Sequence, residues 1–428
     1  MTTQDFRGIT YTIETLTGND QTFQGTRGND WVEAPGSNNI ISTDKGNDVI
    51  LAGLEFLFIG DYPPYGGSAI FYSPLPEAST TVGNEIIDAG SGDDYVAVGK
   101  GNYIVDLGKG NNIFDGGTAT GNIQISAGNG NDIIDAGSGN YKIDAGGGNN
   151  WIYLAGGNAS VSAGNGNDII DAGSGNYKID AGGGNNWISL AGGNASVSAG
   201  SGNDVITTNI GGVFALLSYL DGEGKPYKQV IDAGKGNNQI GLTVFGQTSI
   251  TTGSGQDFVL AYSVSTLFGI GEVNSDSVDI LTGSGNDTVI TIDTKSLINT
   301  GSGDDLVIAG AGDDTIYAGS GNDVINLRGG TFSIPSPLDN LGFFGLLFGS
   351  EVPVQGGGND TVYLESGNDT VILGSSGFAT IYDFGKNDRL DVSGLNATFT
   401  RMGHDTLISS GSNSLGILKE YTGSVALV

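Results

Sequence analysis

Aspartates preceded by glycine and asparagine recur along this chain. The tripeptide Gly-Asn-Asp occurs ten times and Gly-Asp-Asp occurs three times. Carboxylates of this kind offer oxygen ligands, which suit a hard cation such as Ca²⁺. The chain has one His and no Cys, so disulfides and thiolate metal sites are excluded. The chemistry to look for is therefore the binding of a hard cation.

The charge of the chain points the same way. It has 47 acidic and 16 basic side chains, for a formal net charge of −31. Such a charge is typical of disorder, but 37% of the residues are hydrophobic and Ile, Val and Leu recur regularly. We infer that a divalent cation neutralises the carboxylates when the chain compacts. The sign of the charge disfavours binding to nucleic acid or to an anionic membrane.

Internal repeats show which elements must position the aspartates. Residues 129–164 and 165–200 are two 36-residue copies that differ only at Tyr153 and Ser189. Each copy divides into four units of nine, in which glycines allow a tight turn and the residues after the acidic position form a strand. Two units make one 18-residue coil, so equivalent residues stack 18 positions apart. The eighth residue of each unit points inward, and the expected core includes Ile134, Ile143, Ile152 and Val161.

This pattern resembles the RTX, or hemolysin-type, calcium-binding nonapeptide repeat GGxGxDxUx, in which U is a large apolar residue. The resemblance spans roughly residues 17–372. It implies an all-β fold, a right-handed parallel β-roll (a β-helix solenoid) with a C-terminal β cap. It also implies several Ca²⁺ ions between successive turns, bound by sixth-position aspartates and backbone carbonyls. The alternative is that Asn-Asp only supplies turn propensity.

The resemblance assigns thirteen aspartates as metal ligands. They are Asp30, Asp48, Asp94, Asp132, Asp168, Asp204, Asp257, Asp287, Asp305, Asp314, Asp323, Asp360 and Asp369. Asp287, Asp305 and Asp323 stack without interruption and are expected to form the strongest sites. In the duplicated segment one edge alternates Asp and Asn, so each gap has one carboxylate and one amide. The opposite edge there carries no carboxylate and is not expected to bind calcium, since its residues are Tyr141, Ala159, Tyr177 and Ala195.

The ends and the interruptions of the repeat complete the predicted organisation. Residues 1–16 form an N-terminal cap, residues 17–372 the roll, and residues 373–428 a C-terminal cap. The tail Gly423–Val428 is similar to a type I secretion signal, and the N-terminus has no apolar core of a signal peptide. Inserts near 53–82, 207–229, 260–280 and 327–355 are rich in apolar residues. They either project and contact partners or pack on the roll as covers, and the recurring Tyr and Trp residues leave the same two alternatives open.

The sequence predicts a protein that is not an enzyme, because it has no HExxH motif and no GxSxG motif. The sequence contains no run of 18 apolar residues, so no membrane span is predicted. We expect a secreted, calcium-binding protein of the cell surface or extracellular matrix, in a surface layer, sheath or fibril. Its all-repeat architecture resembles that of oscillin-like surface fibril proteins. The alternative is a calcium-dependent adhesin or an ice-binding module, and the expected partners besides calcium are further copies of the chain or a cell-surface polymer.

Overall fold

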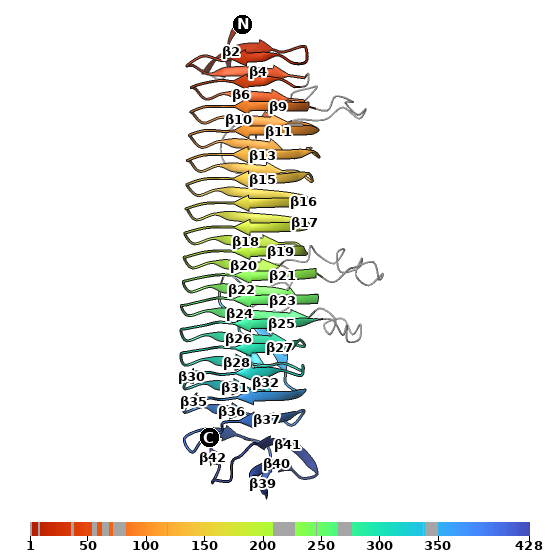
Figure 1. Ribbon diagram of the computed structural model, residues 1–428, viewed down its shortest axis with the longest axis vertical. Helices are drawn as coiled ribbons and strands as arrows, with labels where there is room; N and C mark the ends of the chain where they lie inside the picture. Colours follow the sequence, from red (N-terminus) through yellow and green to blue (C-terminus); the bar gives the residue numbers. More distant parts are fainter. Residues whose placement is uncertain are drawn as a thin grey trace, which may run out of the picture. The chain divides into compact units, whose positions relative to one another are not determined.

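A computed structural model describes residues 2–428 except 7–8, 36–37, 54–57, 62–67, 72–82, 118, 209–226, 245, 264–275, 337 and 339–349. The chain divides into two compact units, residues 1–183 and 184–428. Each unit is a solenoid of stacked parallel strands, which confirms the predicted β-roll (Figure 1). The described part of the chain contains no helix of the length and apolarity needed to cross a membrane.

The described residues of the first unit form seventeen strands. They are β1 (Thr2–Phe6), β2 (Ile9–Thr15), β3 (Thr22–Gln24), β4 (Asp30–Ala34), β5 (Ile40–Ser42), β6 (Val49–Ala52), β7 (Phe58–Asp61), β8 (Ser68–Phe71), β9 (Gly83–Asp88), β10 (Tyr95–Val98), β11 (Gly101–Asp106), β12 (Ile113–Gly116), β13 (Asn122–Ser126), β14 (Ile133–Ala136), β15 (Asn140–Asp144), β16 (Trp151–Ser162) and β17 (Ile169–Asp180). The even-numbered strands β2, β4, β6, β10, β12 and β14 form one parallel stack, and β3, β5, β9, β11, β13 and β15 form the other. The long strands β16 and β17 continue both stacks.

The core of this unit lies between the two stacks. Side chains alternate inward and outward along each strand, as the period of two residues requires. Ile134 and Ile152 from one stack are completely buried, and Ile143 and Val161 from the other are nearly so. The predicted core is therefore confirmed, and each coil buries its apolar residues against its neighbours.

Glycines form the turns because the backbone there excludes a side chain. Gly146 and Gly148 adopt φ angles of +79° and +116°. A Cβ at Gly148 would also collide with the carbonyl oxygen of Gly130 in the preceding coil. Glycine at these positions lets successive turns approach closely and brings their backbone carbonyls together.

The second unit has the same construction. Its strands are β18 (Trp187–Leu190), β19 (Gly193–Ser198), β20 (Val205–Thr208), β21 (Tyr227–Asp232), β22 (Gln239–Val244), β23 (Gly246–Thr251), β24 (Phe258–Ser263), β25 (Ser277–Leu281), β26 (Thr288–Ile292), β27 (Lys295–Asn299), β28 (Leu306–Ile308), β29 (Thr315–Tyr317), β30 (Ser320–Gly321), β31 (Val324–Asn326), β32 (Gly329–Ser333), β33 (Glu351–Gln355), β34 (Asn359–Tyr363), β35 (Ser366–Gly367), β36 (Thr370–Ile372), β37 (Phe378–Tyr382), β38 (Arg389–Asp391), β39 (Ala397–Met402), β40 (Asp405–Ser410), β41 (Asn413–Leu418) and β42 (Ala426–Leu427). The parallel ladder continues through β37, β38, β41 and β42, and β39–β41 form antiparallel hairpins.

The described residues of the fourth predicted insert pack against the outer face of the second unit. Strands β32 and β33 form an antiparallel hairpin. Its neighbours Ile334 and Leu338, with Val352 and Val354 of the hairpin, are buried in one cluster with Leu260, Tyr262, Ile290, Ile292 and Ile308 of the roll. These residues favour the interpretation of this insert as a cover. Most of the other three inserts lies outside the described residues.

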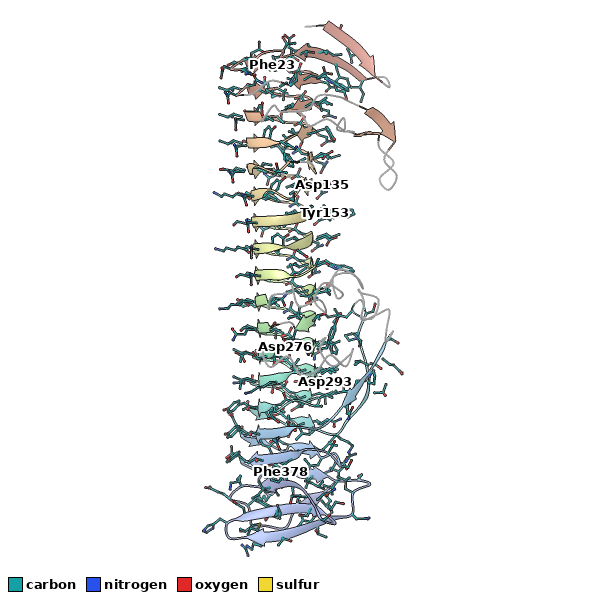
Figure 2. The ribbon with its side chains drawn as sticks, turned by 90° about the vertical axis from the view of Figure 1, so that its right-hand side faces the viewer. Phe23, Asp135, Tyr153, Asp276, Asp293 and Phe378 are labelled. Atoms are coloured by element: carbon teal, nitrogen blue, oxygen red, sulfur yellow. The ribbon has the colours of Figure 1, made fainter. Side chains whose placement is uncertain are left out.

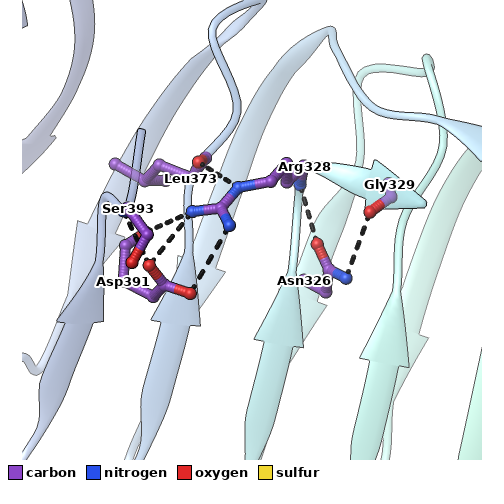
Figure 3. Close-up of polar contacts among 6 residues, drawn as sticks. All are labelled: Asn326, Arg328, Gly329, Leu373, Asp391 and Ser393. Atoms are coloured by element: carbon purple, nitrogen blue, oxygen red, sulfur yellow. Dashed lines mark hydrogen bonds and ion pairs between the residues drawn. The ribbon is translucent and has the colours of Figure 1, made fainter. Parts of the chain in front are cut away.

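The base of that hairpin is fixed by Arg328 (Figure 3). Its guanidinium donates to the Leu373 carbonyl at 3.0 Å and forms an ion pair with Asp391 at 3.1 Å. The Asn326 side chain accepts from the Arg328 backbone N–H at 2.9 Å. The insert is thereby tied to coils that follow it in the chain.

Candidate metal centre

The sixth residue of the repeat forms a row along one edge of each unit, which we call the position-six row. In the first unit it comprises Asp30, Asp48, Asp94, Asn112, Asp132, Asn150 and Asp168. In the second unit it comprises Asn186, Asp204, Asn238, Asp257, Asp287, Asp305, Asp323, Asp369 and Asp388. Eleven of the thirteen predicted ligands lie in these two rows. Asp314 and Asp360 lie together on the other edge of the second unit.

In each row, one side-chain oxygen of every residue after the first accepts a backbone N–H. The N–H of Asp287 donates to Oδ1 of Asp305 at 2.8 Å, and the N–H of Asp305 donates to Oδ1 of Asp323 at 2.9 Å. The same bond runs along both rows, always from the backbone of one coil to the side chain of the next. The row therefore has a direction, and Oδ1 of every acceptor is occupied.

Among the residues that the structure describes, the second carboxylate oxygen is buried and has no hydrogen-bond partner in nine aspartates. These are Asp48, Asp94, Asp132, Asp204, Asp257, Asp287, Asp305, Asp314 and Asp323. At most 2% of each of these residues is exposed. A buried carboxylate oxygen without a partner is costly, and a cation bound beside it would offset that cost.

Burial has a direct effect on the acidity of these groups. It raises the pKa of Asp94, Asp314 and Asp323 to about 7. It raises the pKa of seven others to about 6, namely Asp48, Asp132, Asp168, Asp204, Asp257, Asp305 and Asp369. Backbone hydrogen bonds lower these values, but loss of hydration dominates. In the metal-free protein these carboxyl groups therefore take up protons at a higher pH than an exposed aspartate does.

The other edge carries a shorter arrangement of the same kind. In the second unit, Ser296 N–H donates to Asp314 Oδ1 at 2.8 Å, and Asp314 N–H donates to Asp360 Oδ1 at 3.2 Å. Burial, and then the charge of Asp314, raises the pKa of Asp360 to about 8. This pair is a second candidate site.

In the first unit the same edge is filled mainly by aromatic and small residues. Tyr141 and Tyr177 are buried inside the roll, and the Tyr141 hydroxyl accepts from Gly137 N–H at 3.0 Å. These two tyrosines are therefore core residues. Glu85, which the sequence analysis missed, is also buried on this edge, and burial raises its pKa to about 7. Its place in the repeat, one coil before Tyr103, is the signal that could have found it.

The position-six rows end on residues that the protein itself satisfies. Asp30 accepts from the backbone N–H of Thr26 at 2.7 Å and from its hydroxyl at 3.1 Å. Asp388 was also missed by the sequence analysis, because it lies 19 residues after Asp369 and outside the Gly-Asn-Asp pattern. It accepts from Asp369 N–H at 2.9 Å and from Gly385 N–H at 2.6 Å.

The family model of the RTX calcium-binding nonapeptide repeat (4 copies) matches eight stretches of the chain. They are residues 13–53, 79–114, 126–161, 144–179, 153–188, 162–197, 298–331 and 356–376. This chain is an RTX repeat protein. The search of curated proteins found no match. The RTX repeats identify the chain as a calcium-binding repeat protein.

The residues of this RTX roll fit calcium. Ca²⁺ takes about six to eight oxygen ligands, and carboxylates and backbone carbonyls both serve. Among the described residues, no three His, Cys, Asp or Glu side chains come together around one point. Each ion would therefore need backbone carbonyls of the glycine turns beside one or two carboxylates. The buried, unpartnered aspartate oxygens supply the negative charge for that ligand set.

Proposed function

We propose that this RTX protein is a structural component of a cell surface or extracellular matrix, secreted by a type I route and folded outside the cell by calcium. The observation that carries the proposal is the row of buried aspartate oxygens without partners. Stacked carboxylates repel one another, and an ion between coils converts that repulsion into attraction. The free energy of metal binding then contributes directly to the free energy of folding of the roll.

The same coupling suits export. A chain whose folding depends on calcium stays unfolded in a cytosol with little free calcium, and it can pass through a channel in that state. In that unfolded chain the tail Gly423–Val428, which is similar to a type I secretion signal, would be free for recognition. These features support type I export of the chain.

Circular dichroism of metal-free protein, titrated with calcium, tests the folding step. The β signal is expected to be weak in metal-free protein at neutral pH and to reach its full value at about millimolar calcium, with Mg²⁺ at equal ionic strength as the control. An identical β signal in excess chelator would contradict the proposal. Electron microscopy of the calcium-loaded protein tests the structural role, and ordered layers or fibrils are the expected result.

An adhesive role is the second candidate, and a row of outward apolar residues in the first unit favours it. Trp151, Ile169 and Tyr153 are 38%, 42% and 44% exposed on one face. Asp135 and Tyr153 are neighbours on that face (Figure 2). Binding of monomeric protein to a surface polymer, lost in a Trp151→Ala, Tyr153→Ala variant, would select this role over assembly.

A further inference from the structure

Four asparagines interrupt the position-six rows, and all four make the same contacts. Nδ2 of Asn150 donates to the Gly148 carbonyl at 3.3 Å and to the Ala163 carbonyl at 3.2 Å. Gly148 belongs to the same turn, and Ala163 begins the turn of the next coil. Asn112, Asn186 and Asn238 repeat this pair of bonds with their own turn and the next, at 3.2 to 3.5 Å.

The orientation of these amides is fixed by the backbone. Oδ1 of Asn150 accepts the N–H of Asp132 at 3.0 Å, as an aspartate Oδ1 does elsewhere in the row. Nδ2 therefore points to the place that Oδ2 takes in an aspartate. A flipped amide would direct its oxygen at two carbonyl oxygens and its NH₂ at an N–H, and both contacts would be repulsive.

The same place has opposite chemistry in the two kinds of turn. In an aspartate turn such as that of Asp132, Oδ2 has no donor, and by the equivalence of the coils it faces the corresponding carbonyls of its own and the next turn. Oxygen atoms alone are brought together there, so a cation is needed. In an asparagine turn the amide hydrogens already satisfy both carbonyls.

We call the gap between two successive residues of a row a step, and the residue that comes first in the sequence leads it. We propose that Nδ2 of Asn112, Asn150, Asn186 and Asn238 takes the place of a calcium ion. Each step led by asparagine then folds without metal. This inference rests on the proposed calcium-dependent folding. The leading residue of each step decides whether an ion binds, because only that residue directs its second atom into the step.

The duplicated coils show the consequence. The step from Asp132 to Asn150 and the step from Asn150 to Asp168 contain one carboxylate and one amide each. The first presents Oδ2 of Asp132 and Oδ1 of Asn150, two oxygens, and it accepts calcium. The second presents Nδ2 of Asn150 as a donor, and it excludes calcium. Alternating Asp and Asn thus places an ion at every second step.

The test counts bound calcium in the full chain by equilibrium dialysis with ⁴⁵Ca²⁺. Asn150→Asp is expected to bind one more ion per chain than the wild type. Asn149→Asp is the matched control, since it adds the same charge in the same turn. Asn149 is exposed and its Oδ1 accepts the N–H of Asn167, a bond that Asp retains. The control is expected to bind the wild-type number of ions.

Each outcome decides the inference. An unchanged count in Asn150→Asp, or an equal gain in both variants, overturns it while leaving the calcium-dependent fold intact. A wild type that binds no calcium instead refutes the proposed function. Asn186→Asp in the second unit repeats the test at an independent turn, so a folding defect of the first variant does not remove it.

Discussion

Asp132 offers a direct measurement of what each of its two oxygens contributes. Oδ1 accepts the N–H of Asn112 at 2.7 Å, and Oδ2 is buried without a partner. Asp132→Ala removes both oxygens. Asp132→Asn keeps the acceptor Oδ1 and replaces Oδ2 by the donor that Asn150 carries one coil later. The two variants therefore separate the backbone bond from the metal site.

The magnitudes follow from these contacts. In the alanine variant the buried N–H of Asn112 loses its acceptor, at a cost of about 1–3 kcal/mol with or without metal. Loss of one ion costs a further amount of about 2.7 kcal/mol when calcium is at 100 times its dissociation constant. The asparagine variant is expected to lose only the second amount. In metal-free buffer it is expected to equal or exceed the stability of the wild type, because a buried carboxylate oxygen has been removed.

Hydrogen exchange of the peptides spanning residues 108–135 measures the local opening free energy in both buffers. A local measurement is needed because the coils of a solenoid can open separately. If Asp132→Asn destabilised the metal-free protein as much as Asp132→Ala, the assignment of Oδ1 would be wrong. If calcium made no difference to either variant, the assignment of Oδ2 to the metal would be wrong.

Three further predictions concern acidity, the covered face and the buried tyrosines. The metal-free chain is expected to hold more β structure at pH 5 than at pH 8, because burial raises the pKa of Asp94 from its usual 3.8 to about 7 in the folded state. The folded state then binds more protons than the unfolded state and loses stability as pH rises through that range. A β signal in chelator that increased with pH would contradict this. Ile334→Ala is expected to lower the free energy of unfolding by about 2–5 kcal/mol, because Ile334 is buried between the fourth insert and the roll. As the control, Leu281→Ala at an exposed position is expected to change it by less than about 0.5 kcal/mol. Equal effects of the two variants on urea unfolding would show that the insert is no cover. Tyr141→Phe is expected to lower the local opening free energy by about 1–3 kcal/mol, since the Tyr141 hydroxyl accepts from Gly137 N–H and donates to the Gly116 carbonyl. Tyr177→Phe, in the second copy of the repeat, is expected to cost almost nothing, because among the described residues the Tyr177 hydroxyl has no partner. Equal losses of opening free energy in local hydrogen exchange would refute this difference.

The sequence was sufficient to predict the coil, its inward residues and the stacking of the aspartates, because all three follow from a strict period. Asp287, Asp305 and Asp323 stack as the 18-residue spacing requires. The direction of the row could not be predicted in this way. Spacing treats the steps before and after Asn150 as equal, and only the backbone bond to Oδ1 distinguishes them. The packing of Ile334 on the roll could not be predicted from the sequence either, because no period relates an insert to the face that it covers.

The exposed fifth residue of the repeat has a consequence for how such a chain lengthens. Its side chain accepts from the coil that follows, as Asn131 does from Asn149 N–H at 2.7 Å, whereas the sixth residue accepts from the coil that precedes. Each coil thus offers one backbone N–H donor and one side-chain acceptor to each of its two neighbours. A block of whole coils copied into the gene can enter between two existing coils and leave every such bond complete. Growth by duplication is therefore nearly free of structural cost, and residues 129–164 and 165–200, identical at all but one position, are a record of it.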